Sequence, residues 1–521
     1  MPKTFVVIGA GSAGLSACYT LCKYGEQIED FNVILIEQSD HLGGHAKTVN
    51  TDDFKFIDEK IDSGKPLAFE EGEDCDVGFM VCNLSTYPNM LRIYGEIGQE
   101  IEKSDMSFCI HDGKEKGFSW SFQENLSWVF RNIWKPRLIK FLFAHRKFVK
   151  KAIKVLSSTE ESCDTVGEFC SDLDPMFTSK YLLPFVSAVW SVGYGEANKF
   201  AIKPFLRFMH NHRFLGLEPL QWFTPKNRSK SYVQKIINAC GKKLKIKLNT
   251  TAIKINARSH TLEAKNAEGK LEKISYDKLI LASSAPVQAK LDPPAKEWLS
   301  KFSVSTSRVC GHIGDQFMSK VKNDWSSWNV RSDNVGNNQV AITYWISRIQ
   351  NLKNQNILVT VNPSQTPDNI FYDSIMSHPV MDLQSEVAQS QAYLWQGLDD
   401  VYYCGAWLRH GFHEDGFHTG VHAAKLALGE DGRAVPLEYP TATCIMPPDP
   451  ISGTTRHIRH FPRERKFQYP LHLFRFDTRF PPKGFDRQDH YGDVNITLDT
   501  QVRTTCLNRL GFWPAGRIEC K

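Results

Sequence analysis

The sequence predicts an α/β fold in which a Rossmann-like domain is interleaved with an α+β domain. Three observations support this fold class. The chain begins with a short apolar run, a glycine-rich turn and a helix-like stretch, and a second apolar run follows at residues 32–36. A further strand–loop–helix pattern appears only near residue 400. Alternating strands and helices are typical of a parallel sheet, so the late pattern is expected to return to the first domain.

The bulk composition is that of a globular protein of two or more domains. The 521 residues are 41% hydrophobic and 23% charged. No apolar run reaches the roughly 18 residues that a membrane-spanning helix needs. Thirteen dispersed cysteines without C-x-x-C pairs are typical of free thiols in a reducing compartment. We therefore expect a cytoplasmic chain.

The amino-terminal stretch FVVIGAGSAGLSACYTL predicts a dinucleotide-binding turn. Its apolar residues 5–8 form a buried parallel strand, and the three glycines follow as G-x-G-x-x-G. The first glycine makes the turn, the second admits a pyrophosphate, and the third lets the helix pack on the strand. The free N–H groups at the start of the helix favour an anion. The candidate cofactor residues of this element are Gly9, Gly11, Ser12, Ala13 and Gly14.

The second apolar run, NVILIE, predicts the neighbouring strand. It ends at Glu37, where a carboxylate can accept hydrogen bonds from a ribose diol. A second glycine pair, Gly43 and Gly44, follows shortly after the strand and precedes His45. Glycines at this place bring further backbone amides toward the pyrophosphate.

The stretch GFHEDGFHTG combines two histidines with two acids, which raises the question of a metal site. His413 and His418 are five residues apart, whereas zinc-binding helices place two histidines at i and i+4. His418 and His422 have that spacing, but no third ligand accompanies them, so we predict no metal. Gly416 and Gly420 disfavour a helix through the middle of the stretch. We expect a loop here that leads into a helix at TGVHAAKLAL.

These residues together resemble a group of FAD-dependent oxidoreductases in the amine oxidase and phytoene desaturase superfamily. The group is associated with cyclopropane fatty acid synthases and is related to a polyunsaturated fatty acid isomerase. The matching pieces cover most of residues 1–430 in the expected order: LGGHAKTV, DVGFMVCNLSTYPN, SDMSF, YLLPFVSAVWS, RFMHNHRFLGL and GFHEDG. His45 stands where the wider superfamily typically has arginine. Asn227-Arg228 replace a glycine pair, and Gly405-Ala406 stand where Gly-Asp is frequent.

The resemblance implies a two-lobe, amine-oxidase-like architecture with non-covalent FAD. It places the N-terminus of the late helix against the isoalloxazine ring, and His413 either bonds to the flavin or caps the loop. Together with the residues of the first turn, the implied cofactor contacts are Glu37, Gly43, Gly44, His45, Phe79, Met80, Ala252, Gly405, Glu414, Asp415 and Gly416.

Phe79 and Trp190 are the candidate walls of a substrate pocket, and core packing is the alternative for both. No Ser/His/Asp or Cys/His spacing indicates a nucleophile, so no catalytic residue is assigned. Transfer of a hydride from a substrate carbon to flavin depends on binding and orientation, and a protein base is optional.

The order of the motifs divides the chain into domains. Residues 1–105, 206–285 and 396–430 are expected to form the FAD-binding domain, residues 106–205 and 286–395 the substrate domain, and residues 431–450 a proline-rich linker. The tail, residues 451–521, has 13 Lys and Arg against 7 Asp and Glu. It resembles the truncated start of an uncharacterised domain that often neighbours these flavoproteins.

A basic stretch bears on the substrate. Residues 126–156 contain nine Lys or Arg and no acid. The segment 137–156 predicts a helix with apolar and basic residues on opposite faces. Such a helix can lie on an anionic membrane surface, or it can pack on the core with its lysines in water. Nucleic acid binding is not expected. The apolar face comprises Leu138, Phe141, Leu142, Val149, Ile153 and Leu156, and the basic face Lys140, Lys147, Lys151 and Lys154.

The sequence therefore predicts an FAD-dependent oxidoreductase that acts on a hydrophobic substrate, with a fatty acyl chain as the first choice. The reaction would be a desaturation, an oxidation or a double-bond isomerisation. A flavin amine oxidase is the alternative enzyme. A flavin-stabilised scaffold or lipid-binding protein is the alternative of another class.

Overall fold

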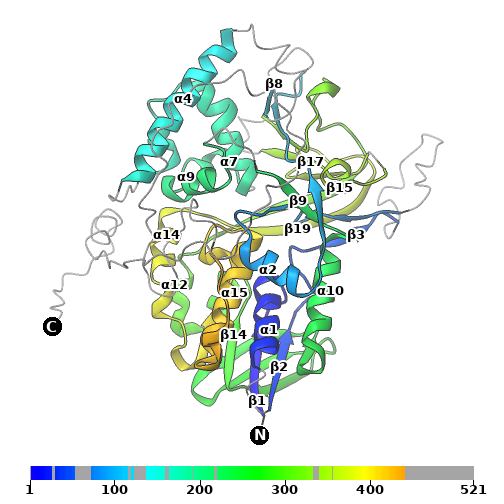
Figure 1. The fold of residues 1–521 in the computed structure, drawn as a ribbon, viewed down its shortest axis with the longest axis vertical. Helices are drawn as coiled ribbons and strands as arrows, with labels where there is room; N and C mark the ends of the chain where they lie inside the picture. Colours follow the sequence, from blue (N-terminus) through cyan, green and yellow to red (C-terminus); the bar gives the residue numbers. More distant parts are fainter. Residues whose placement is uncertain are drawn as a thin grey trace, which may run out of the picture.

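The computed structural model describes residues 2–25, 30–52, 72–114, 119–122, 136–158, 164–190, 192–215, 220–332, 340–354 and 356–439. The predicted tail at 451–521 lies outside the described residues, as do residues 440–450 of the linker and residues 126–135 of the basic stretch. The described chain forms two lobes, with the first strands at the bottom of Figure 1 and a group of helices at its upper left.

The lower lobe is built on a five-stranded parallel sheet, which confirms the predicted Rossmann-like architecture. The strand order is β10-β2-β1-β14-β20, and every neighbouring pair is parallel. The strands are β1 (Lys3–Ile8), β2 (Phe31–Ile36), β10 (Leu244–Lys247), β14 (Lys278–Leu281) and β20 (Val401–Tyr403). Three segments that are distant in the sequence thus meet in one sheet.

Both faces of this sheet are covered, which explains why its first strand is apolar throughout. Phe5 and Val7 join a core cluster with α1 (Ser12–Tyr24), α10 (Arg228–Cys240) and α15 (His413–Leu428). Val6 and Ile8 join a second cluster on the other face. That cluster includes α11 (Ala285–Leu291), α12 (Lys296–Leu299) and an antiparallel sheet of β11 (Thr251–Asn256), β12 (Thr261–Lys265) and β13 (Leu271–Ser275).

The upper lobe contains a seven-stranded sheet of order β19-β15-β18-β17-β16-β7-β8. Both segments predicted for the substrate domain contribute strands to it. They are β7 (Phe108–His111), β8 (Ser119–Phe122), β15 (Val304–His312), β16 (Trp328–Arg331), β17 (Ala341–Trp345), β18 (Leu358–Val361) and β19 (Ile370–Pro379). Two small sheets connect the lobes: β3 (Thr48–Asn50) with β4 (Asp74–Asp76), and β5 (Cys82–Asn83) with β9 (Trp222–Pro225) and β6 (Ile101–Ser104).

Helices form the other half of the upper lobe (Figure 1). They are α4 (Pro136–Ser157), α5 (Val166–Cys170), α6 (Pro175–Phe177), α7 (Leu183–Trp190), α8 (Tyr194–Ala197) and α9 (Ile202–Asn211). Three further helices lie outside this helical group: α2 (Pro88–Glu96), α13 (Ile346–Ile349) and α14 (Leu383–Ser390). The boundary predicted between residues 205 and 206 falls inside α9. This helix packs on α4 and α5, so it is one unit with the helical group.

The basic stretch forms the predicted helix, but its apolar face differs from the expected one. Phe141 and Val149 are buried as expected, together with Phe148. Leu142 is 42% exposed, because it lies at the edge of the apolar arc rather than over the core. Lys147 and Lys151 of the predicted basic face are not simply solvated, since both form ion pairs with Asp172.

Candidate functional site

The glycine-rich turn between β1 and α1 has the geometry of an anion-binding turn. Gly9 has φ +104°, a conformation that favours glycine. A Cβ on Gly14 would lie 1.8 Å from the carbonyl oxygen of Gly9, so α1 can approach β1 only with glycine there. A Cβ on Gly11 would have no heavy atom within 4 Å. Gly11 therefore borders open space beside the N-terminus of α1, where Ser12 and Ala13 begin the helix.

Glu37 fastens the end of β2 to this turn. Its Oε2 accepts a hydrogen bond from the backbone N–H of Ala10 at 2.7 Å, and its Oε1 accepts one from Ser39 at 2.9 Å. The second glycine pair folds over the same place. Gly43 donates its N–H to the Ala10 carbonyl at 2.9 Å, and a Cβ on Gly44 would lie 3.1 Å from the Cα of Gly11. Four predicted cofactor residues thus converge on one turn.

The late stretch 411–420 is helical from His413 onward, and the expectation of a loop through its middle is wrong. Helix α15 begins at His413 and includes Gly416 and Gly420. Both glycines face α1: a Cβ on Gly416 would lie 2.1 Å from the Ser12 Oγ, and one on Gly420 would lie 2.1 Å from the Ala13 carbonyl oxygen. The close helix packing outweighs the low helix propensity of glycine. The matching register makes α1 and α15 parallel, so their N-termini lie side by side.

Gly405 connects the sheet to this helix. It lies two residues after the end of β20 and has φ +154°. Its N–H donates to the Oγ1 of Thr419 at 3.0 Å, and the same hydroxyl donates to the Asp415 carbonyl at 2.8 Å. The end of β20 is thereby held against the first turns of α15.

Phe79 and Met80 are buried at the junction of the lobes. The ring of Phe79 stacks on the imidazole of His413 with 3.9 Å between centroids, and its N–H donates to the His45 carbonyl at 2.8 Å. The hydroxyl of Tyr232 lies 2.5 Å from His413 Nε2. Desolvation lowers the pKa of His413 to about 3 and raises that of Tyr232 well above its usual range. The tyrosine therefore donates to a neutral imidazole.

The two acids of α15 point away from α1. Glu414 accepts hydrogen bonds from the N–H groups of Asn89 and Met90 at 3.0 and 2.9 Å, which caps the N-terminus of α2. Asp415 pairs with buried Arg409 at 3.3 Å. Burial raises the pKa of Glu414 to about 8 and that of Asp415 to about 6. The resemblance placed both acids beside the cofactor, and in the structure each has a protein partner.

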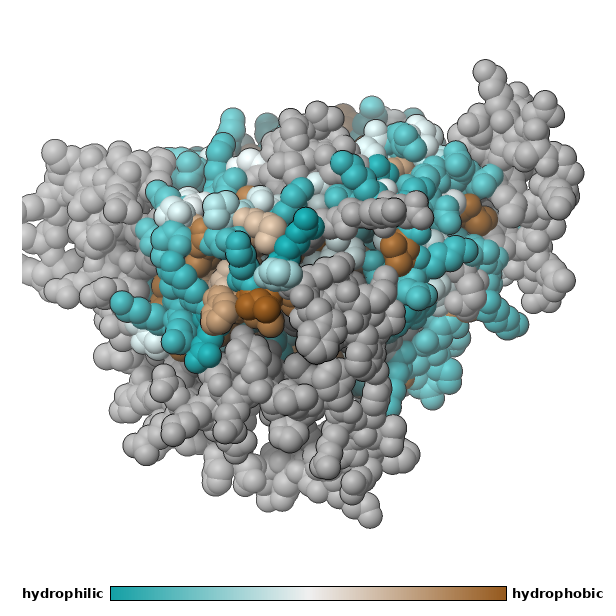
Figure 2. Space-filling model, turned by 90° about the horizontal axis from the view of Figure 1, so that it is seen from above, coloured by the Kyte–Doolittle hydropathy of each residue, from teal (hydrophilic) through white to brown (hydrophobic). Residues whose placement is uncertain are grey.

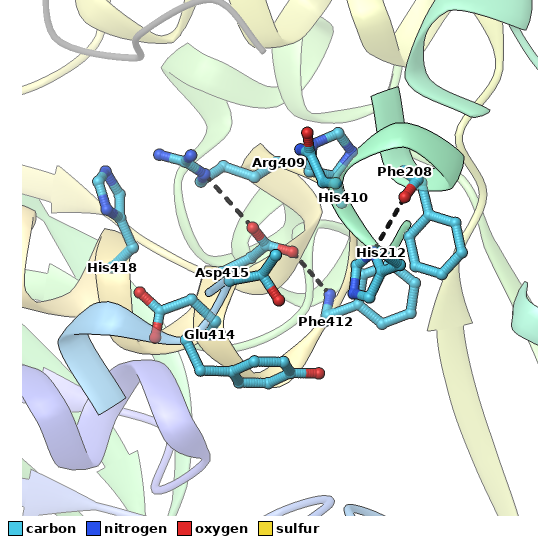
Figure 3. Close-up of a pocket in the computed structure, with 11 residues that line it drawn as sticks. Phe208, His212, Arg409, His410, Phe412, Glu414, Asp415 and His418 are labelled. Atoms are coloured by element: carbon cyan, nitrogen blue, oxygen red, sulfur yellow. Dashed lines mark hydrogen bonds and ion pairs between the residues drawn. The ribbon is translucent and has the colours of Figure 1, made fainter. Parts of the chain in front are cut away.

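A cavity lies next to these acids (Figure 3). Its wall is aromatic on one side, where α9 and the residue before α15 meet, and polar on the other. Trp190 lies behind this wall rather than in it: its indole N–H donates to the His410 carbonyl at 3.2 Å, and its ring packs on Phe208 and Phe412. The lining residues are Thr86, Tyr87, Phe208, Asn211, His212, Arg409, His410, Phe412, Glu414, Asp415 and His418.

Ala252 lies outside this cluster, at the start of β11. The chain leading to it touches the nucleotide end of the fold, because the N–H of Thr250 donates to the Glu37 carbonyl at 2.9 Å. Among the described residues, no group of three or more His, Cys, Asp or Glu side chains is arranged to hold a metal ion.

Sequence reasoning missed Asp76 and the pairing of Tyr232 with His413. Buried Asp76 accepts hydrogen bonds from the Ser229 N–H at 3.0 and 3.1 Å and from Gln350 at 3.1 Å, and so ties α10 to the upper lobe. Its position two residues before GFM was the available signal, since a buried acid needs hydrogen-bond partners. Nothing local in the sequence links residues 232 and 413.

The residues at the start of α10 bear on the place where this sequence lacks the glycine pair of the group it resembles. Asn227 and Arg228 have φ +62° and +66°, so both occupy the left-handed region. A glycine pair adopts this conformation without strain, whereas arginine does so at a cost of about 1 kcal/mol. Arg228 has compensating hydrogen bonds to the Asp74 carbonyl and to Glu102.

Comparisons with known proteins agree with the architecture. Residues 7–97 match the family model of an NAD(P)-binding Rossmann-like domain. An L-amino acid oxidase from Cerastes cerastes is 45% identical over 51 residues, a match that spans 10% of this chain and 9% of that oxidase.

Solved structures resemble far more of the chain. Cyclohexylamine oxidase from Brevibacterium oxydans aligns with a TM-score of 0.57 and 13% identity over 83% of this chain and 100% of the oxidase. A fatty acid isomerase from P. acnes aligns with a TM-score of 0.53 and 14% identity over 81% and 97%. UDP-galactopyranose mutase aligns with a TM-score of 0.54 and 14% identity over 83% and 97%. These matches confirm the predicted fold: the chain shares the two-lobe architecture of these three enzymes.

Proposed function

We propose that the protein is an FAD-dependent oxidoreductase. The observation that carries this proposal is the parallel packing of α1 and α15, which brings two helix N-termini together beside the open space at Gly11. Each N-terminus presents free N–H groups and the positive end of a helix dipole. Two of them at the carboxyl edge of a parallel sheet favour an anionic dinucleotide.

The residues present fit FAD. Glu37 lies where a ribose diol would bind, and Gly11, Gly43 and Gly44 leave the backbone accessible to a pyrophosphate. When bound, FAD supplies a flavin ring that accepts a hydride. The chain itself supplies the N-terminus of α15, which favours negative charge. The neutral His413 lies at this N-terminus, held by Tyr232 and Phe79.

A hydrophobic substrate, most specifically a fatty acyl chain, is the second part of the proposal. The aromatic side of the cavity, with Tyr87, Phe208 and Phe412, supports an apolar ligand. The structural similarity to a fatty acid isomerase supports acyl chemistry. The similarity to cyclohexylamine oxidase favours amine oxidation as the second candidate function.

The test is the absorption spectrum of the purified full chain, followed by anaerobic addition of an unsaturated fatty acid or, separately, an amine. We expect a flavin spectrum that the fatty acid bleaches, or a double-bond isomer of the fatty acid among the products. Bleaching by the amine alone would select amine oxidation. If neither compound reduces the flavin and no product forms, the flavin-stabilised scaffold would be the remaining hypothesis. A chain that stays colourless with added FAD would refute the proposal.

A paired substitution locates the cofactor. Gly11→Ala places a methyl group in open space and leaves the fold unchanged, but it obstructs the pyrophosphate. We expect it to weaken FAD binding by roughly tenfold or more. Gly95→Ala, in α2, also meets no neighbouring atom within 4 Å and should bind FAD like the wild type.

A further inference from the structure

Helix α4 exposes three large apolar side chains at its N-terminal end. Phe143 is 69% exposed, Ile139 51% and Leu142 42%. Exposed single apolar residues are common, but three within five positions of one helix form a continuous patch. Hydrophobic side chains lie among hydrophilic ones on the face of the molecule drawn in Figure 2.

The same helix is strongly basic. Residues 136–157 include seven Lys or Arg and no Asp or Glu. Arg146 and Lys150 are exposed and follow Ile139 and Phe143, respectively, at the helical spacing i+7, so apolar and basic groups share one outward face. Exposed Lys140 flanks the apolar group.

The opposite face fixes the orientation of this surface. Phe141 stacks on Trp120 with 3.6 Å between ring centroids, and Phe148 is fully buried. Lys151 binds the Phe169 carbonyl at 2.6 Å and also pairs with Asp172. The helix therefore cannot turn its apolar patch inward without breaking this packing.

We propose that the outward face of α4 binds the surface of an anionic lipid bilayer. Ile139, Leu142 and Phe143 would enter the boundary between headgroups and acyl chains, while Arg146 and Lys150 would contact anionic headgroups. A nucleic acid would use the basic groups but would leave the apolar side chains in water. Among the described residues, no helix is long and apolar enough to cross a membrane.

This surface is one helix away from the cavity. Helix α4 packs on α9, where Phe148 and Phe205 have ring centroids 6.5 Å apart, and Phe208 and Asn211 of α9 line the cavity. The inference deepens the proposed function, since an enzyme docked in this way would take its acyl substrate from lipid. The binding of lipid itself does not depend on FAD.

The test is flotation of the full chain with vesicles of phosphatidylcholine alone and of phosphatidylcholine with phosphatidylserine. We expect binding to the anionic vesicles only, and weaker binding as salt is raised. Arg146→Gln with Lys150→Gln should weaken binding by roughly 25-fold, at about fivefold for each charge. Ile139→Ser with Phe143→Ser should weaken binding at least tenfold, because two large apolar side chains no longer enter the bilayer.

Matched controls are available in other parts of the chain. Ile375→Ser removes an apolar side chain that is 64% exposed on β19. Lys254→Gln with Lys273→Gln removes two exposed charges from the β11–β13 sheet. Both should bind vesicles like the wild type. All variants alter exposed side chains, and an unchanged thermal unfolding temperature verifies their folding.

Equal binding by the α4 variants and the wild type would overturn the proposal, even if the chain binds vesicles through its basic tail. Absence of binding to anionic vesicles would also overturn it. The flavin spectrum and the reaction with dispersed substrate are measured on the same samples. A failure of the membrane proposal therefore leaves those signals intact, whereas a failure of the proposed function removes them without changing flotation.

Discussion

The packing of α15 on α1 gives a sharp prediction for Gly420→Ala. The added Cβ would lie 2.1 Å from the Ala13 carbonyl oxygen, 2.9 Å from its carbonyl carbon and 2.3 Å from the Ser16 Oγ. Ordinary contacts of a Cβ begin at 3.4 Å, and although the Ser16 side chain can rotate, the Ala13 backbone cannot. The two helices must therefore separate by roughly 1 Å.

Two opposing effects set the magnitude. Alanine is more favourable than glycine inside a helix by about 1 kcal/mol. Overpacking of a tight core contact costs about 1–3 kcal/mol, and a clash with backbone belongs at the upper end. We expect Gly420→Ala to lower the free energy of unfolding by about 2 kcal/mol. Gly416→Ala should cost less, since the Ser12 Oγ that it meets at 2.1 Å can rotate.

The assay is urea denaturation followed by tryptophan fluorescence, with the thermal midpoint as a second measure. Gly95→Ala is the control, because it lies in a helix and its Cβ meets nothing within 4 Å. It should stabilise the protein by about 0.5–1 kcal/mol. If Gly420→Ala proves as stable as Gly95→Ala, the close helix contact does not exist and the argument from it fails.

Three further predictions concern buried charge and backbone conformation. Asp415→Asn removes the carboxylate that pairs with buried Arg409 and should cost about 3 kcal/mol in urea denaturation at pH 7; a loss below about 1 kcal/mol would contradict the buried pair. The folded pKa of Glu414, about 8, exceeds its unfolded value, so its contribution to stability is complete below pH 4.5 and is lost as pH rises through 8. The wild type should therefore lose stability relative to Glu414→Gln between pH 5 and 8, and a parallel pH dependence of the two proteins would refute this. Asn227→Ala should be less stable than Asn227→Gly by about 1 kcal/mol because of its φ of +62°, and equal thermal midpoints would argue against that conformation.

Local sequence patterns were enough to predict the nucleotide-binding turn of the first domain. The apolar strand, the three glycines and Glu37 lie within 33 residues, and each has a reason that can be read from its neighbours. The structure places all of them at one turn. The two glycines of α15 show the limit of this approach. Their helix propensity indicated a loop, but the partner that requires them is α1, some 400 residues away.

The predictions for the apolar face of α4 and for the two acids of α15 differ from the structure for related reasons. The period of the apolar residues predicted a helix correctly, but the width of the buried arc depends on which elements lie below it, so Leu142 was misplaced. For Glu414 and Asp415, the sequence shows two acids and no partners. The role of Glu414 follows from Asn89, which only the folded chain brings close, and that of Asp415 from Arg409, whose burial six residues earlier the sequence does not show.

The pairing of β1 with β14, and of β14 with β20, has a consequence for biosynthesis. Phe5 pairs with Lys278, and Leu279 pairs with Val401, so a ribosome must deliver most of the chain before the central sheet is complete. Until then the nascent β1 and β2 have an unfilled edge, which is prone to wrong pairing and to aggregation. A nascent chain arrested before residue 400 should therefore need chaperone protection. A chain extended past α15 and released from the ribosome should no longer need it.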